Sequence, residues 1–474
     1  MASPNIEFYE IGSSIRKPGK YFEFNTRLAV RALPGNPQRV VMIGQMLETG
    51  LADPLQTVDI FSDDQAATYF GRGSLAHLMA TEAIICNSYL QLQMIGVKDA
   101  TASVAAKGSV ALTGTASGTG ILRLHLGVAR VDVAVSVADT AAELATALVD
   151  AIGQHPELPV TAAVNENTTV ALTAKNKGEC GNGIVLRVQC SAPGITVTPT
   201  LMAGGEGDPD IAPALAAIFA AGHNIVVCPF STQEALTALR THLDKVSGPL
   251  EQRGAMGVAG WNKSLSTGTT LTGQINSGRI TVGWLNGSTK LPAQIAAAYA
   301  AVIASEEDPA RPLNTLSMVS LDVPPVELRP GRNEQENALY NGLTPFEVGP
   351  GNKVQIVRAI STYTRNAEGV DDVSLLDITT IRTLDYVRKA CRERIALRFP
   401  RDKLSTRTRL KVRSELLDVL YKLEELEIVE EVDANKDRLL VERDSQDVNR
   451  MDAAIPVDIV NGLHVFAGRI DLLL

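Results

Sequence analysis

The sequence predicts a multidomain protein that combines an α/β body, an inserted mostly-β domain and an α+β carboxy-terminal domain. Strands of buried type alternate with helices in residues 21–100 and again in residues 201–363, a pattern typical of a sheet covered by helices. Between them, residues 101–200 are rich in small and β-branched residues separated by glycine-containing turns. After residue 364, two long helical stretches are followed by short strands, which indicates a further domain.

Composition narrows the class of protein. The 474 residues are 45% hydrophobic, enough for about two to four domains with buried cores. The net charge of -9 argues against nucleic acid as a partner. The five cysteines contain no Cys-x-x-Cys pair, which argues against a disulfide framework and a zinc site. We find no secretory signal, and the most apolar helical stretch, residues 293–304, is shorter than the ~20 residues that span a bilayer, so we expect a soluble protein made in a cytoplasm, without membrane insertion.

The first part of the α/β body, residues 21–100, follows a short extended stretch at residues 6–15. Pro18 and Gly19 separate that stretch from the body, so we expect residues 1–20 to form an arm. We expect strands at residues 21–32 and 39–45, a helix that begins after Ser62 and ends at Gly71, and a helix that begins near Ser74 and runs to about residue 89.

The inserted block, residues 101–200, is predicted to be mostly β. The expected strands are residues 109–113, 121–126, 131–137, 160–164, 168–174 and 184–189, and one amphipathic helix is expected at residues 140–152. Such insertions are tolerated at exposed loops of a host domain.

Residues 201–363 return to the α/β pattern. Strands are expected at residues 224–228, 255–259 and 280–284, and helices at residues 211–221, 232–245, 269–276 and 293–304. At least three strand-helix units in succession favour a parallel sheet with both faces covered by helices.

The carboxy-terminal part begins after a strand at residues 354–360. A helix ending at Pro400 is expected to bury Ile381, Leu384, Val387, Cys391 and Ile395, with Arg382, Arg388, Lys389, Arg392, Arg394 and Arg398 on its remaining surface. Further elements are expected as a helix over residues 405–427 and strands at residues 439–443, 455–459 and 464–474, giving an inner domain at 364–454 and a terminal arm at 455–474.

Charge divides sharply in this part of the chain. Residues 382–413 hold twelve Arg or Lys against three acids, and residues 415–447 hold twelve acids against four bases. Two readings follow for the basic helix: its arginines pair with the acidic segment of the same domain, or they dock onto an acidic protein partner.

Catalytic motifs are missing from the sequence. The glycine-rich turn at residues 204–210 is not followed by the Lys and Ser or Thr of a phosphate loop, and its acids Glu206, Asp208 and Asp210 would repel phosphate, so Asp208 or Asp210 as a helix cap is the simpler interpretation. There is no Gly-x-Ser-x-Gly and no His-Glu-x-x-His, and the six histidines, His223 among them, are scattered. We therefore predict no enzyme, no catalytic, cofactor-binding or metal-binding residues and no cofactor.

Several segments, in their order along the chain, resemble the contractile tail sheath proteins of bacteriophages, most closely the Mu-like class. The segments similar to that class are Tyr21-Phe22-Glu23-Phe24-Asn25, residues 39–44, Phe70-Gly71-Arg72-Gly73-Ser74-Leu75, residues 204–210 and residues 311–316. Those similar to sheaths in general are Glu336-Asn337-Ala338-Leu339-Tyr340-Asn341-Gly342-Leu343-Thr344, residues 357–363 and the helix at 378–398.

The resemblance implies a subtilisin-like doubly covered sheet that lacks the protease triad, an outward-facing inserted domain and a carboxy-terminal domain nearest the tail tube. It further implies stacked hexameric rings of this chain, with the tail tube protein, baseplate proteins and the tail terminator as partners, in the virion tail after assembly in the host cytoplasm. Contraction would drive the tube through the host envelope for genome delivery. The alternatives are the sheath of a non-viral injection system, such as a bacteriocin or secretion machine, and a subtilisin-like hydrolase.

In sheaths of this kind, terminal arms add strands to neighbouring subunits. The matching arm residues here would be Ile6, Phe8, Tyr9, Ile11, Val457, Ile459, Leu463, Val465 and Phe466. A lone terminal strand can complete the edge of a neighbour's sheet, because its unpaired backbone groups form main-chain hydrogen bonds there. Candidate tube-facing residues are Arg382, Arg388, Lys389 and Arg392.

Overall fold

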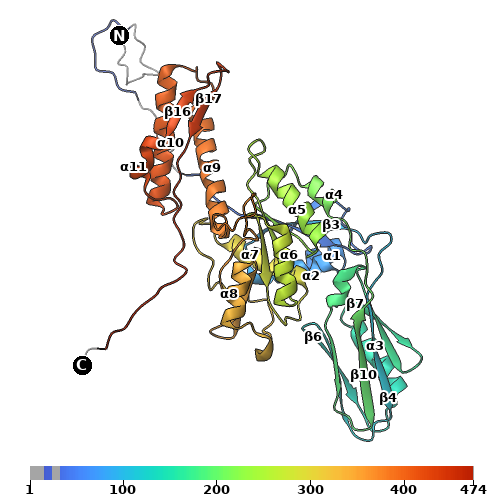
Figure 1. Cartoon of the computed structure of the whole chain (residues 1–474). Coiled ribbons are helices and arrows are strands. Elements are labelled where there is room, and N and C mark those ends of the chain that lie inside the picture. Colours follow the sequence, from blue (N-terminus) through green and yellow to red (C-terminus); the bar gives the residue numbers. More distant parts are fainter. Residues whose placement is uncertain (1–14, 24–32, 473–474) are drawn as a thin grey trace. The chain divides into compact units, whose positions relative to one another are not determined.

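The computed structural model describes residues 15–23 and 33–472, and these fall into two compact units (Figure 1). Of the described residues, the small unit comprises 15–23, 33–35, Arg388–Leu426 and Glu431–Pro456. The large unit comprises Asn36–Val387, Glu427–Glu430 and Val457–Leu474.

The large unit is built on an eight-stranded sheet of order β15-β14-β13-β12-β11-β1-β3-β2. Its six central strands run parallel, and the two edge strands pair antiparallel to their neighbours. The strands are β1 (Arg39–Gln45), β2 (Thr57–Ile60), β3 (Gln91–Val97), β11 (Ile225–Val227), β12 (Met256–Trp261), β13 (Ile280–Trp284), β14 (Thr344–Gly349) and β15 (Lys353–Ile356). The predicted strand at 39–45 (β1) and the predicted parallel strands β11, β12 and β13 are confirmed, whereas β2, β3 and β14 were not predicted.

Helices cover both faces of this sheet. An added Cβ at Gly257 of β12 would meet Leu239 of α5 (Gln233–Val246), whereas one at Gly260 would meet the backbone of α7 (Pro292–Ser305). The helix α2 (Leu75–Cys86) packs against α7 and β1 on the second of these faces. The other helices of the body are α1 (Asp63–Phe70), α4 (Ala212–Ala217), α6 (Leu265–Ile275) and α8 (Arg332–Tyr340).

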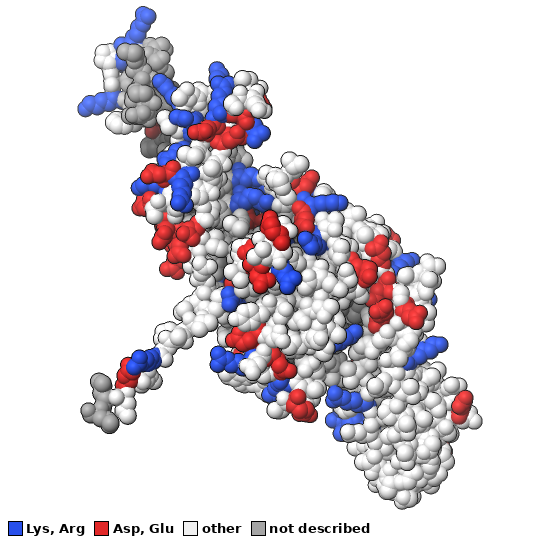
Figure 2. Space-filling view, in the orientation of Figure 1, with Lys and Arg blue, Asp and Glu red and all other residues white. Residues whose placement is uncertain are grey.

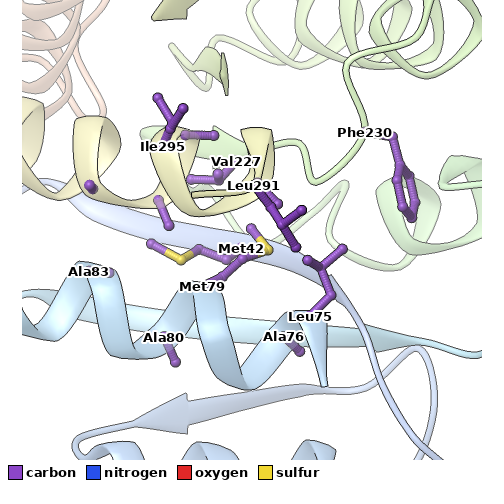
Figure 3. Close-up of a cluster of buried hydrophobic side chains, with 14 of the residues drawn as sticks. Met42, Leu75, Ala76, Met79, Ala80, Ala83, Val227, Phe230, Leu291 and Ile295 are labelled. Atoms are coloured by element: carbon purple, nitrogen blue, oxygen red, sulfur yellow. The ribbon is translucent and has the colours of Figure 1, made fainter. Parts of the chain in front are cut away.

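The core lies between the sheet, α2 and α7. Figure 3 shows Met42 of β1 and Val227 of β11 below Ile295 of α7, with Met79 and the alanines of α2 alongside them. The strand β1 and the helix α2 can pack closely because Gly44 and Ala76 are small. An added Cβ at Gly44 of β1 would lie 2.6 Å from the Cβ of Ala76. The predicted helix starts are also confirmed, since Ser62 and Ser74 cap α1 and α2 with their side-chain oxygens.

The segment between β3 and α4 forms two antiparallel sheets and one helix. The four-stranded sheet has the order β10-β4-β8-β7 and the three-stranded sheet has the order β6-β5-β9. The helix α3 (Ala141–Gly153) begins at a Thr140–Glu143 capping box and buries Leu144, Leu148 and Ile152 against the sheets. The strands are β4 (Lys107–Gly114), β5 (Gly120–Leu126), β6 (Ala129–Val135), β7 (Val160–Asn165), β8 (Thr169–Ala174), β9 (Leu186–Cys190) and β10 (Ile195–Ala203), of which β10 was not predicted.

The small unit holds the end of α9, two further helices and a β-hairpin. The helix α9 (Ile378–Arg398) has the predicted bounds, and its residues 388–398 belong to this unit. The helix α10 (Thr406–Glu425), capped by Ser405, buries Val412, Leu416, Val419 and Leu423, as its apolar stripe predicts. After α11 (Val432–Asn435), β16 (Leu440–Arg443) pairs with β17 (Met451–Ala454).

The structure corrects the predictions for the last strands. No strand covers residues 455–459, where a single bridge joins Ile459 to Val429, and β17 lies just before this stretch. Pro456 has no N–H to donate, so the ladder with β16 cannot continue through it. Residues 464–472 form no strand either. In the predicted strand at 21–32, residues 21–23 have no strand structure, and the remainder lies outside the described residues.

The buried face of α9 also differs from the predicted one. Leu384 is 38% exposed, whereas Arg382 and Arg394 are only 7% and 4% exposed. Val387 and Cys391 are buried as predicted, at 4% and 6% exposed, but the buried side of the helix also includes the two arginines and leaves out Leu384. Arg394 donates to Glu415 and Asp418, whereas Arg382 donates to the Glu306 carbonyl and its Nε and Nη1 are buried without a hydrogen-bond partner.

Candidate assembly interface

The four predicted tube-facing residues of α9 lie in different environments. Arg382, in the large unit, donates to the Glu306 carbonyl at the end of α7. Burial lowers its pKa to about 10, although Glu306 and Asp308 favour the charged form. Its side chain is thus enclosed by its own chain. In the small unit, Arg388 and Lys389 are half-buried and Arg392 is exposed, and Lys389 Nζ donates to the Gly35 carbonyl at 2.7 Å.

Two arginines near the end of α9 pair with α10. Arg394 Nη1 lies 3.2 Å from Glu415 Oε2 and 2.5 Å from Asp418 Oδ2, and Arg398 Nε lies 3.4 Å from Glu415 Oε2. Burial would raise the pKa of Asp418, but hydrogen bonds from Arg394 and Lys422 outweigh it and hold that pKa below its ordinary value. Pairing within the domain is therefore confirmed for Arg394 and Arg398. Figure 2 shows the two charge signs interleaved over the helices of this unit.

The hairpin of the small unit offers strand edges. Within the described residues, β16 and β17 pair only with each other, so each strand has one side without a strand partner. Val441 of β16 is buried, and Arg413 of α10 donates to the carbonyls of Lys436 and Leu439 just before the hairpin. A two-stranded ribbon is marginally stable by itself and gains from further strands.

The carboxy-terminal stretch, which belongs to the large unit, is extended and largely exposed. Leu463, Val465 and Phe466 are 80%, 77% and 87% exposed, whereas Val457 and Ile459 are half-buried. Such exposure of consecutive large apolar side chains suits a segment that is covered by a partner. The amino-terminal arm residues Ile6, Phe8, Tyr9 and Ile11 lie outside the described residues.

The usual ligand position of an α/β sheet is filled by the chain itself. Ligands bind outside the carboxyl ends of the strands where the strand order reverses, which here is between β1 and β11. At that point the buried Gln45 donates to Asp99 Oδ1 and to the Lys177 carbonyl, both at 2.6 Å. Cys180 Sγ lies 3.4 Å from Gln45 Oε1, and burial raises the pKa of this thiol to about 12. The inserted segment thus closes this crevice.

The histidine pattern gives no triad geometry. His77 Nδ1 accepts the Gly73 N–H and Nε2 lies 3.1 Å from Asp63 Oδ1, while the Thr81 hydroxyl bonds Asp63 and not the imidazole. In a catalytic triad the nucleophile hydroxyl bonds the imidazole, and the imidazole in turn bonds the carboxylate. Here the hydroxyl bonds the carboxylate directly. His223 bonds Gln93 at 2.6 Å beside β11. Among residues 15–23 and 33–472, no cluster of three His, Cys, Asp or Glu could hold a metal ion, and no helix is long and apolar enough to cross a membrane.

Solved structures define the class to which this fold belongs. The fold matches a sheath tail protein of Desulfitobacterium hafniense with a TM-score of 0.53 and 14% identity, over 94% of this chain and 97% of the other. It matches a chain of the anti-feeding prophage baseplate with a TM-score of 0.51 and 12% identity, over 97% and 100% of the two chains. The chain therefore has the mixed α/β multidomain fold of these two chains.

Sequence comparison gives the family. The model of the phage tail sheath protein central domain matches residues 204–362, and that of the phage tail sheath C-terminal domain matches residues 370–472. The Mu-like prophage FluMu tail sheath protein of Haemophilus influenzae is 34% identical over 99% of this chain and 100% of its own length. The chain therefore belongs to the phage tail sheath protein family, whose members are structural proteins and not enzymes.

Proposed function

We propose that this chain polymerises around a tail tube as the contractile sheath of a Mu-like phage and that its contraction drives the tube through the host envelope. The observation that carries the proposal is an extended carboxy-terminal stretch with exposed apolar side chains. The same chain has a hairpin, β16 and β17, whose strands pair only with each other among the described residues. An arm from one copy would add a strand to the hairpin of another copy. Because donor and acceptor surfaces differ, the contact propagates as a helix.

We further propose that copies of this chain form stacked hexameric rings in the virion tail after assembly in the host cytoplasm. Its partners there would be a tail tube protein, baseplate proteins and a tail terminator. The body would be a relative of the subtilisin-like sheet, which its parallel central strands and doubly covered faces support. The inserted domain would face outward. A non-viral injection machine is the second candidate, favoured by the likeness of fold to the anti-feeding prophage chain.

Removal of either terminal arm tests the proposal. Deleting residues 1–15 or ending the chain after His464 should leave folded protein that does not form tubes, because the strand donor is lost while the core elements remain. Electron microscopy of the purified protein would show tubes for the full chain and none for either truncation. Undiminished tubes from both truncations would refute the arm role.

Charge reversal on α9 tests the tube-facing residues. We propose that Arg388, Lys389 and Arg392 face the tube and leave out the enclosed Arg382. Changing Arg388 and Arg392 to glutamate should lower assembly on purified tail tubes about tenfold, because like charges oppose docking. Co-sedimentation with tubes measures this. Changing the exposed Arg407 and Arg409 of α10 to glutamate alters the net charge equally and should leave binding intact.

A further inference from the structure

The base of the carboxy-terminal stretch is attached to the large unit at two points. The first is a short backbone ladder. The Glu430 N–H donates to the Asp458 carbonyl at 2.9 Å, and the Val460 N–H donates to the Ile428 carbonyl at 3.3 Å. These bonds fix the chain a few residues after Pro456.

The second attachment point is the side chain of His464. Its Nδ1 lies 3.0 Å from Asn314 Nδ2 and its Nε2 lies 3.5 Å from Asp377 Oδ1, at the start of α9. Asp377 is itself held by two hydrogen bonds from Arg358, at 2.8 and 2.7 Å. The His464 side chain is only 14% exposed, between the highly exposed Leu463 and Val465.

The chain also passes very close to the body just before this histidine. An added Cβ at Gly462 would lie 2.6 Å from Pro312 Cγ, so a larger residue there would displace the stretch. The neighbouring Asn314 Oδ1 is buried without a hydrogen-bond partner. Either orientation of this amide can bond the imidazole, because neutral Nδ1 donates in one tautomer and accepts in the other. The contact therefore does not depend on one tautomer.

From Val465 to Leu472, where the described residues end, the chain makes no such contact. Ile470 and Leu472 are 98% and 82% exposed. In the part of the chain that the structure describes, no backbone hydrogen bond joins residues 465–472 to another element. The boundary between the anchored part and the exposed part of this stretch therefore lies at His464.

We infer that His464 is the anchoring residue of the carboxy-terminal arm and that the strand given to a second copy begins at Val465. This inference rests on the proposed arm function and narrows it, since Val457, Ile459 and Leu463 then belong to the anchored base. The ten residues 465–474 reach about 33 Å when extended. An anchored arm starts from fewer orientations and loses less conformational entropy when it pairs with a neighbour, so the anchor favours assembly.

Substitution of His464 in the full-length chain tests the anchor. His464→Ala should raise the lowest protein concentration that yields tubes about five- to tenfold, the effect of losing one side-chain hydrogen bond. Sedimentation over a concentration series measures this threshold. His464→Asn should restore it, because the asparagine amide occupies the position of imidazole Nδ1 and can still bond Asn314. His464→Gln reaches only toward Asp377 and should restore less, since that contact is the longer one.

Substitution of Asn314, which contacts His464 Nδ1, tests the same contact without changing His464. Asn314→Ala should raise the threshold by a similar factor, and the double variant should be no worse than His464→Ala alone, because His464→Ala already removes the contact with Asn314. An unchanged thermal midpoint would show that folding is not the cause. A threshold that is unchanged or lowered in His464→Ala would overturn the inference, and a lowered one would mean that the contact restrains assembly.

Comparing the chain that ends after His464 with His464→Ala distinguishes the anchoring role of His464 from the strand-donating role of the arm. If the chain that ends after His464 fails to form tubes while His464→Ala forms them normally, the arm function stands and the anchor is refuted. If the truncated chain forms tubes normally, the proposed arm function fails, and the anchor inference fails with it.

Discussion

Replacing Glu82 with alanine is expected to destabilise the large unit by about 3–5 kcal/mol, the cost of leaving a buried charge without its partner. Glu82 of α2 and Lys290, just before α7, are 2% and 9% exposed and form an ion pair through Lys290 Nζ and Glu82 Oε1. Gln294 Nε2 donates to the same oxygen at 2.8 Å. The variant would leave the ammonium group enclosed between the two helices that cover one face of the sheet.

Urea unfolding of the monomer measures this effect. The protein must stay below the concentration at which tubes form, because polymerisation stabilises the folded state by mass action. A matched variant removes the pair together: Glu82→Leu with Lys290→Met should recover most of the loss, since two apolar side chains leave no unpaired charge. A cost below about 1 kcal/mol for Glu82→Ala would mean that water reaches Lys290 and that the pair is not truly enclosed.

The α/β body could be predicted from sequence because its signals are local. The helix α7 is buried along almost its whole length, and its apolar run of helix-forming alanines stands out for that reason. Ser62, Ser74 and Thr140 mark helix starts through hydrogen bonds to backbone N–H groups within the next turn. Features of this kind need no knowledge of distant contacts.

The missed elements depend on distant partners. The edge strand β2 is short and partly exposed, and only its pairing with β3 makes it a strand. Arg394 is buried because Glu415 and Asp418 lie opposite it, about twenty residues further along the chain. The charge division of this region predicted such pairing in general but could not assign the pairs. His464 gave no signal, because Asn314 and Asp377 are remote in sequence.

The carboxy-terminal stretch shows a different limit of sequence reasoning. Its apolar residues have the composition of a strand, yet residues 464–472 form none. A strand requires a paired neighbour, and under the proposed function that neighbour belongs to another copy of the chain. On that view, the sequence pattern describes the assembled protein, whereas the structure describes a single chain.

Acidification is expected to weaken the large unit well before its carboxylates titrate. Burial is the main cause that lowers the pKa of both His223 and His242 to about 4, and the nearby Arg39 lowers that of His223 further. Histidine in an unfolded chain titrates near 6.5. Between about pH 6.5 and 4 the unfolded state therefore binds protons that the folded state does not, so stability falls as the pH falls through this window.

The slope of the free energy of unfolding against pH gives a quantitative test. Each such histidine contributes at most about 1.4 kcal/mol per pH unit, so the two together contribute up to about 2.8 kcal/mol per pH unit near the middle of the window. His242, whose ring stands edge-on to Phe219 at 6.0 Å, can be changed to glutamine, and the slope should fall by the contribution of this one histidine. Thr241→Gln, at the adjacent exposed position of α5, should shift the free energy of unfolding without changing its slope. Urea titrations at half-unit pH steps measure both effects. A free energy of unfolding that stays constant from pH 6.5 to 4 would show that the folded protein takes up these protons as readily as the unfolded chain does, and that burial does not keep the two imidazoles neutral.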